Sequence, residues 1–159
     1  MNKVNLNEEL NLFCPDGFRI LSEEEITDQN CFSSEEEGIE LVSNALSMTV
    51  LVSWKQLNAI SAMMKNAKDI AKDMEPQVKE TLEAQDYRLE GFREVLLGER
   101  SAYGFCYEYE ADGFPMYGET FALKNNKNLY SFTLRMKMDT REEGLTEWKK
   151  ICVSSSWLQ

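Results

Sequence analysis

The chain has 159 residues, of which 28 are acidic and 17 basic, and it has no histidine, so its net charge is −11. This length suits a single domain spanning residues 1–159, and the 3 Trp, 6 Tyr and 8 Phe exclude a disordered chain. The negative charge argues against nucleic acid as a partner, because it repels the phosphate backbone, and the lack of histidine removes the commonest general base and metal ligand.

The sequence also bears on compartment. No apolar segment follows the N-terminal residues, which argues against a signal peptide, and the apolar-rich residues 45–54 are too few to cross a bilayer. We therefore expect a cytoplasmic protein with no membrane partner, and nothing in the sequence predicts an oligomeric state. The cysteines at positions 14, 31, 106 and 152 lack C-x-x-C spacing, which predicts free thiols and no zinc site. A Cys14–Cys31 disulfide stays open for an exported chain.

The first predicted elements are two short strands joined by a turn at Pro15–Asp16–Gly17, since proline and glycine both favour turns. Residues 45–54 are rich in β-branched and aromatic side chains, which predicts a buried strand. From Asn58 to Leu82 apolar residues recur at steps of three and four, which predicts an amphipathic helix. We expect Pro76 to kink or break this helix, because proline lacks an amide donor.

The second half of the chain predicts an antiparallel meander with apolar and polar residues in alternation. Four strands are expected, over residues 88–97, 103–109, 115–123 and 130–136. Thr140 and Glu143 have the spacing of a capping box, which predicts that a helix begins there. That helix is expected to pack its Trp148 side on the sheet.

Three segments of the chain are distinctive: the FCPDGF motif of residues 13–18, the aromatic hairpin of residues 103–121 and the KKICVSSSW residues 149–157. In this order they resemble the opening, the central strands and the final helix of the PsbP-like superfamily. The resemblance implies an α+β fold, in which an antiparallel β-sheet is packed between helices as an α/β/α sandwich. It also implies a protein that presents a surface, as photosystem extrinsic subunits, a Ran-binding import factor and type VI effector chaperones do. No functional residue is carried over, because the segment of residues 58–85 exceeds the family's usual first helix.

The candidate functional residues are two acidic runs and a pair of methionines, all assigned to partner binding: Glu23, Glu24, Glu25, Glu35, Glu36, Glu37, Met63 and Met64. Acidic runs are mostly solvated loops or helix starts, and methionines at helical spacing are mostly core. The alternative is that the acidic runs bind a basic protein partner and that the methionines form an apolar groove for a partner. The expected function is a non-enzymatic protein-binding module (a small chaperone, an immunity-type inhibitor or an adaptor) that acts through its sheet or long helix, with no catalytic residue, metal or cofactor.

Two other functions stay open. Glu108 and Glu110 share a strand face with Glu119 across the hairpin, and clustered carboxylates with raised pKa values would suit an enzyme. The same alternation is also that of a solvent-facing sheet. Alternatively, the aromatic face of residues 103–109 lines a pocket beneath a helix in a small-ligand carrier, although such a face is more often core.

Overall fold

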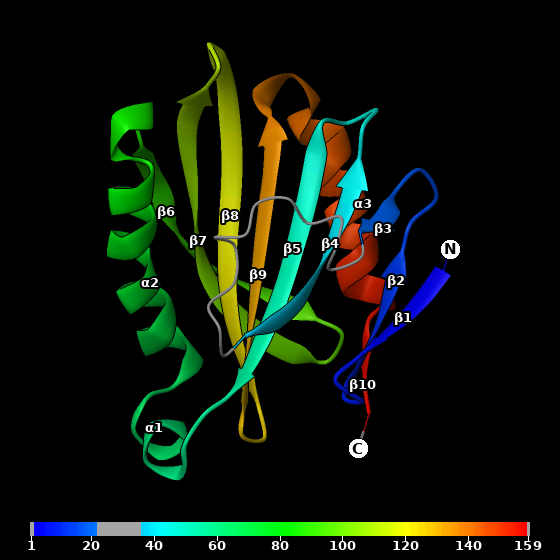
Figure 1. Cartoon of the computed structure of the whole chain (residues 1–159), viewed down its shortest axis with the longest axis vertical. Helices are drawn as coiled ribbons and strands as arrows, with labels where there is room; N and C mark the ends of the chain where they lie inside the picture. Colours follow the sequence, from blue (N-terminus) through cyan, green and yellow to red (C-terminus); the bar gives the residue numbers. More distant parts are fainter. Residues whose placement is uncertain (1, 22–35, 159) are drawn as a thin grey trace.

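The computed structural model describes residues 2–21 and 36–158, and its centre is a seven-stranded antiparallel sheet with a long helix on either side (Figure 1). In spatial order the strands are β3 (Arg19–Leu21), β4 (Glu37–Ser43), β5 (Met48–Gln56), β9 (Asn128–Lys137), β8 (Phe114–Asn125), β7 (Arg100–Ala111) and β6 (Arg88–Leu97). A second, three-stranded sheet contains β1 (Asn2–Leu6), β2 (Leu10–Cys14) and β10 (Ser156–Trp157). The helices are α1 (Ala59–Met64), α2 (Ala67–Thr81) and α3 (Arg141–Ser154), with 3-10 turns η1 (Glu83–Gln85) and η2 (Met138–Thr140).

The strand register places the two long helices on opposite faces of the sheet. Phe105 on β7 is paired with Thr120, whereas Phe121 on β8 is paired with Gly104, so Phe105 and Phe121 point to opposite sides. The ring of Trp148 on α3 stacks on Phe121, with centroids 6.3 Å apart. On the other face α2 packs on β7 and β8. The predicted α+β class and the sheet between helices are therefore confirmed.

Each face has its own core. On the α3 side, fully buried side chains from both sheets and from α3 form the larger cluster, which includes Leu12, Val52, Phe132 and Trp148. On the α2 side, Phe105, Tyr107 and Tyr109 form a smaller cluster with Leu82, and half-buried side chains of α2 pack against it. The predicted packing of the Trp148 side of α3 on the sheet is correct.

The two short strands and the turn predicted near the N-terminus are present, but the strands do not form a hairpin. The amide of Phe18 donates to the carbonyl of Pro15 over 3.1 Å, and Gly17 has a φ of +91°. The strands on either side do not pair with each other, because β2 pairs with β1 and β10 while β3 pairs with β4. The turn thus carries the chain from one sheet to the other, and one of the two strands beside β2 comes from the far C-terminus.

The break in the helical segment falls before Pro76, at Asn66. This residue has extended backbone, with φ −88° and ψ 171°, and its side chain accepts a hydrogen bond from the amide of Asp69 at 2.8 Å. An asparagine N-cap satisfies an amide at a helix start, which favours a new helix here. α2 then continues through Pro76, so a break there, one of the two predicted outcomes, does not occur. Pro76 is exposed, so water can reach the carbonyl of Lys72 that its missing amide leaves without a donor.

Two smaller predictions also need correction. Thr140 makes no side-chain capping bond at the start of α3, because its hydroxyl donates to the carbonyl of Leu46 at 2.5 Å. Glu37 begins strand β4, where a loop or helix start was expected, and its carboxylate accepts a hydrogen bond from the indole of Trp54 at 3.1 Å. The strands predicted for the second half are confirmed, since residues 88–97 form β6 and the other three lie within β7, β8 and β9.

Candidate functional site

Met63 and Met64 lie on α1, a six-residue helix beyond the end of β5 (Figure 1). Their side chains are 87% and 75% exposed, and that of Ile60 on the same helix is 70% exposed. We call these three residues the α1 tip. The interpretation of this methionine pair as core is therefore wrong, whereas Met74, farther along the segment, does pack against the Leu82 cluster.

The α1 tip is held in place from both ends. Before it, the amide of Leu57 donates to the carbonyl of Lys127 at 2.7 Å. After it, the ammonium of Lys124 on β8 donates to the carbonyl of Lys65 at 2.6 Å, and the Lys65 ammonium lies 2.6 Å from a carboxylate oxygen of Asp73. These contacts fix the backbone on both sides of α1 while its apolar side chains point away from the core.

Only part of the acidic runs lies within the described residues. Glu23, Glu24, Glu25, Glu35 and Cys31 lie outside the described residues. Glu36 lines a cleft of about 360 Å³ that Lys65 and Asp73 also line. The structure thus places Glu36, the middle residue of the second acidic run, in one cleft with residues at the junction between α1 and α2.

The carboxylates proposed for an enzyme do not form one cluster. Glu119 on β8 is fully buried, Glu108 on β7 is half-buried and Glu110 is exposed. Glu119 Oε2 accepts a hydrogen bond from the Tyr117 hydroxyl at 2.6 Å, and its Oε1 lies 3.3 Å from Arg93 Nη2. Burial raises the pKa of Glu119, and this rise is opposed by the Tyr117 hydrogen bond and the positive charge of Arg93.

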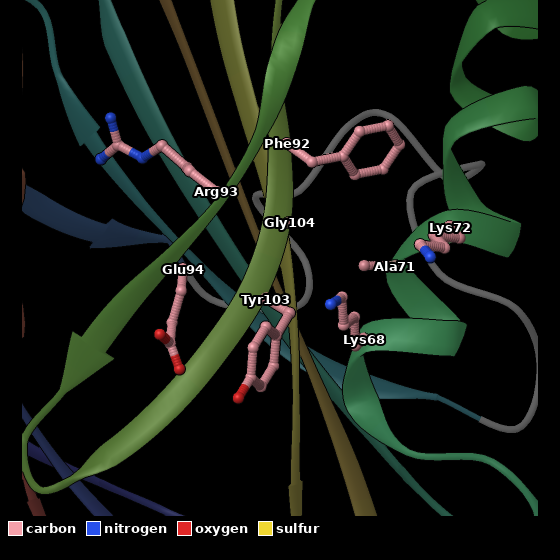
Figure 2. Close-up of a pocket in the computed structure, with 8 residues that line it drawn as sticks. All are labelled: Lys68, Ala71, Lys72, Phe92, Arg93, Glu94, Tyr103 and Gly104. Atoms are coloured by element: carbon pink, nitrogen blue, oxygen red, sulfur yellow. The ribbon is translucent and has the colours of Figure 1, made fainter.

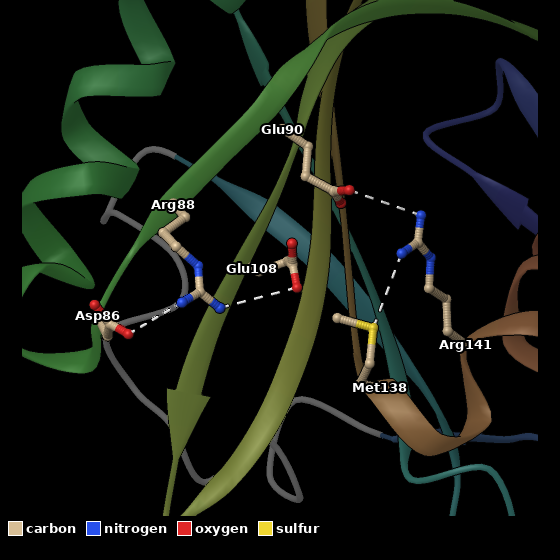
Figure 3. A network of polar contacts seen from close by, with 6 residues as sticks. All are labelled: Asp86, Arg88, Glu90, Glu108, Met138 and Arg141. Carbon is tan, nitrogen blue, oxygen red and sulfur yellow. Dashed lines mark hydrogen bonds and ion pairs between the residues drawn. The ribbon is translucent and has the colours of Figure 1, made fainter.

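Arginines pair with three other acidic side chains at this end of the sheet (Figure 3). Arg88 on β6 lies 3.3 Å from Asp86 and 3.9 Å from Glu108. Arg141, at the start of α3, lies 3.9 Å from Glu90, which is the extra residue of a β-bulge in β6. The Arg141 guanidinium also covers the ring of Tyr117 at 4.2 Å, which helps to enclose the Tyr117–Glu119 pair.

The aromatic face of β7 divides into a core part and a cleft part. Phe105, Tyr107 and Tyr109 are buried beneath α2, as the core interpretation expects. Tyr103, at the other end of the row, lies beyond this packed cluster and borders a cleft of about 380 Å³ between α2 and the β6–β7 edge (Figure 2). The lining residues are Lys68, Ala71, Lys72, Phe92, Arg93, Glu94, Tyr103 and Gly104.

The sequence analysis missed this cleft. Lys68 and Lys72 have the four-residue spacing that puts both on one side of a helix, but the spacing does not say which strand they face. Phe92 is in the predicted strand over residues 88–97, but only the tertiary structure shows that β6 is an edge strand whose Phe92 ring is 49% exposed. Within residues 2–21 and 36–158 no group of three or more acidic or cysteine side chains could hold a metal ion. None of the described helices has the length and apolarity to cross a membrane.

Neither the protein-family models nor the curated protein sequences match this chain. Solved structures do match its fold. The PsbP protein of the cyanobacterium Synechocystis superposes with a TM-score of 0.67 at 11% identity, covering 99% of this chain and 92% of its own. LpqN of Mycobacterium tuberculosis, a protein involved in cell envelope biogenesis, gives 0.62 at 14% identity, covering 94% of this chain and 83% of its own.

A protein of unknown function from Pseudomonas aeruginosa gives a TM-score of 0.51 at 11% identity, covering 97% of this chain and 94% of its own. At these identities the similarity concerns the arrangement of helices and strands. The α/β/α order, the antiparallel sheet and the flanking helices are thus shared with these structures. This chain has the PsbP-like fold.

Proposed function

We propose that this protein is a non-enzymatic protein-binding module, an adaptor or small chaperone that docks to an apolar surface of its partner through the α1 tip. The observation that carries the proposal is the exposure of Ile60, Met63 and Met64 on one short, anchored helix. Proteins rarely leave several large apolar side chains exposed together unless another surface covers them. Methionine suits such a contact because its flexible, polarisable side chain adapts to different partner surfaces.

The arrangement of the carboxylates supports a role without catalysis. Glu119, whose burial raises its pKa, is enclosed by Tyr117 and Arg93 and lines neither of the two clefts described above. Glu108 is paired with Arg88, and Glu110 is exposed on the same strand. A general acid has to reach the substrate, so an enclosed carboxyl is a poor candidate.

The cytoplasmic location predicted from the sequence is part of this proposal. Among the described residues, Cys14, Cys106 and Cys152 are buried free thiols. Free cysteines of this kind are typical of a reducing compartment. Cys31 lies outside the described residues, so a Cys14–Cys31 disulfide stays a prediction for an exported form.

An apolar contact and an acidic contact differ in their response to salt. Docking through the α1 tip should be retained at high ionic strength, because burial of apolar surface is not screened. Docking to a basic partner through Glu23–Glu25 and Glu35–Glu37, as an immunity-type inhibitor would do, should weaken steeply with salt. The proposal therefore predicts a partner that stays bound at high salt.

The test is site-specific photocrosslinking in the native cells. A photoreactive amino acid at position 63 should give one dominant crosslinked protein, and the double variant Met63→Glu/Met64→Glu should lose that protein in affinity capture at both low and high salt. The control is position 153, because Val153 is a large apolar residue that is also well exposed, at 75%, but lies on α3.

A crosslink at position 153 in place of position 63, or capture that survives Met63→Glu/Met64→Glu, would contradict docking through α1. Capture that is lost at high salt in the unchanged protein would favour the acidic runs. The variant's circular-dichroism spectrum and melting temperature should match those of the unchanged protein, because exposed positions tolerate substitution.

A further inference from the structure

The cleft between α2 and the β6–β7 edge is a candidate site of a different kind from the α1 tip. We propose that it binds a small organic anion with a flat aromatic body, such as an aryl carboxylate. The proposal does not depend on the proposed partner, since the cleft lies along α2 and the tip lies on α1. It rests on three features: a wall of lysines, an aromatic surface opposite them, and a gap left by small side chains.

The positive wall comes from α2. Lys68 and Lys72 are one helical turn apart and both line the cleft, and Figure 2 shows the side chain of Lys68 extending into the space beside Ala71. Neither lysine forms an ion pair with another described residue, although acidic side chains greatly outnumber basic ones in this chain. Two adjacent ammonium groups without such a partner suit a carboxylate or another compact anion.

The apolar surface comes from the edge strands. Phe92 on β6 turns its ring toward α2 (Figure 2), and this ring contacts that of Phe105 with centroids 5.7 Å apart. Tyr103 on β7 lines the cleft farther along. Phe92 remains 49% exposed after this packing, so an aromatic ligand would bury ring surface that now faces water.

The gap has a cause in the sequence of α2. The side chains that α2 turns toward the sheet are small at Ala67 and Ala71, which are buried, and large at Met74 and Val78, which pack on the aromatic cluster. The helix therefore fills the space over β7 in its later turns and leaves it open in its first two. At about 380 Å³ the cleft lies at the lower end of the roughly 300–1,000 Å³ typical of small-molecule sites.

Two further charged residues at the cleft do not cancel the lysines. Arg93 points away from α2 (Figure 2), and its guanidinium pairs with the buried Glu119 on the α3 side. Glu94 faces Tyr103 across the β6–β7 ladder, and its carboxylate raises the pKa of the Tyr103 hydroxyl. The two lysines on α2 outnumber this single carboxylate on the strand side of the cleft, which suits a ligand with one anionic group and an aromatic body.

The experiment titrates the whole chain, labelled with nitrogen-15, with 2-naphthoate and follows the backbone amides by nuclear magnetic resonance. The matched ligand is 2-naphthamide, which has the same shape without the charge. The variant Lys68→Gln/Lys72→Gln removes the positive wall. The control variant is Lys79→Gln, on the same helix but outside the lining residues. All of these positions are exposed, so folding should not change.

We expect saturable shifts of the amides of Ala71, Phe92 and Gly104 with 2-naphthoate, and at least fivefold weaker binding of 2-naphthamide. Lys68→Gln/Lys72→Gln should weaken naphthoate binding at least fivefold, and Lys79→Gln should change it less than twofold. Glu94→Gln should leave the affinity unchanged or raise it, because a nearby negative charge is removed.

Several results would overturn the proposal. These are the absence of saturable shifts and shifts centred on other backbone amides. Equal affinities for 2-naphthoate and 2-naphthamide, or a loss of affinity in Lys79→Gln as large as in Lys68→Gln/Lys72→Gln, would also overturn it. A weakening by Glu94→Gln would show that the site needs a ligand cation as well, which excludes the simple anion. None of these outcomes bears on the crosslinking at α1, so the two proposals fail separately.

Discussion

Tyr117 and Glu119 lie on the same side of β8, and the Tyr117 hydroxyl donates a hydrogen bond of 2.6 Å to the buried carboxylate of Glu119. The second carboxylate oxygen of Glu119 lies 3.3 Å from Arg93 and forms an ion pair with it. Among the described residues this oxygen accepts no hydrogen bond. Burial raises the pKa of Glu119 in spite of these neighbours. The folded protein therefore binds a proton at Glu119 more readily than the unfolded chain does.

The first prediction concerns the pH dependence that follows from Glu119. A raised folded-state pKa gives stability that is fully present below the unfolded pKa of about 4.3 and is lost as the pH rises through the folded pKa. Glu119→Gln keeps an acceptor for Tyr117 and cannot ionise. The free energy of unfolding of this variant, measured in urea, should therefore improve relative to the unchanged protein as the pH rises above the unfolded pKa of about 4.3.

A second variant tests whether Glu119 is the group that causes this pH dependence. The hydrogen bond from Tyr117 lowers the pKa of Glu119, so Tyr117→Phe should move the loss of stability to higher pH. If the unchanged protein instead gained stability over Glu119→Gln as the pH rose, the carboxylate would be stabilised by Arg93 more than it is destabilised by burial.

The second prediction concerns Glu9, which links the two sheets. Its pKa shifts in the opposite direction to that of Glu119. Its carboxylate accepts hydrogen bonds from Tyr130 at 2.6 Å, Asn128 at 2.8 Å and Asn126 at 3.0 Å. Burial raises the pKa of Glu9, but these hydrogen bonds together lower it by more than burial raises it, so the net shift is downward. The stabilisation is present above the unfolded pKa of about 4.3 and is lost as the pH falls through the folded pKa.

Glu9→Gln should therefore reduce the free energy of unfolding by about 1 kcal/mol at neutral pH, since a charged acceptor becomes a neutral one. The difference from the unchanged protein should shrink as the pH falls below about 4. Urea unfolding at several pH values measures both. A deficit that stayed constant in acid would assign the effect to packing and not to charge.

The third prediction concerns two glycines on neighbouring strands. A Cβ at Gly104 would lie 2.0 Å from the carbonyl oxygen of Thr120 on β8, whereas a Cβ at Gly91 would meet nothing within 4 Å. Gly104→Ala should cost at least about 1–3 kcal/mol, because a backbone atom cannot move aside as a side chain can. Gly91→Ala should change stability by less than about 1 kcal/mol. Thermal unfolding followed by circular dichroism compares the two, and equal effects would contradict the close approach of β7 and β8.

The fourth prediction concerns the packing of α3. Trp148 is buried between Phe121 and Phe132, with ring centroids 6.3 Å and 6.2 Å away. Trp148→Ala should lower the free energy of unfolding by about 3–5 kcal/mol through the loss of buried area and the cavity that remains. Val153→Ala, on the exposed side of the same helix, should stay within about 0.5 kcal/mol. A small effect of Trp148→Ala in urea titrations would mean that α3 does not depend on this contact.

Local patterns predicted the elements that depend on neighbouring residues. The two-residue alternation of apolar side chains from Tyr103 onward identifies β7, since it follows from backbone geometry alone. The turn at Gly17 and the helix that carries Trp148 have equally local causes. For the candidate sites, the sequence singled out Met63 and Met64 and left binding to an apolar partner as the alternative to core packing.

The errors arise where distant residues compete for the same groups. The hydroxyl of Thr140 has a capping position available in its own helix, yet it donates to the carbonyl of Leu46, almost a hundred positions away. Glu37 looks like part of a solvated run, but its pairing with Trp54 makes it the start of a strand. Neither contact can be predicted from the spacing of residues that are close in the sequence.

By itself the sequence determined the alternating strands, the amphipathic helices and the absence of histidine, because periodicity and composition are properties of short segments. Tertiary structure alone decided that β2 pairs with β10, that Glu119 is enclosed by Arg93, and that Lys68 faces Phe92 across a cleft. Each of these depends on which strand or helix comes to lie beside another. That choice is made by the summed burial of many side chains from both halves of the chain, and no local pattern contains it.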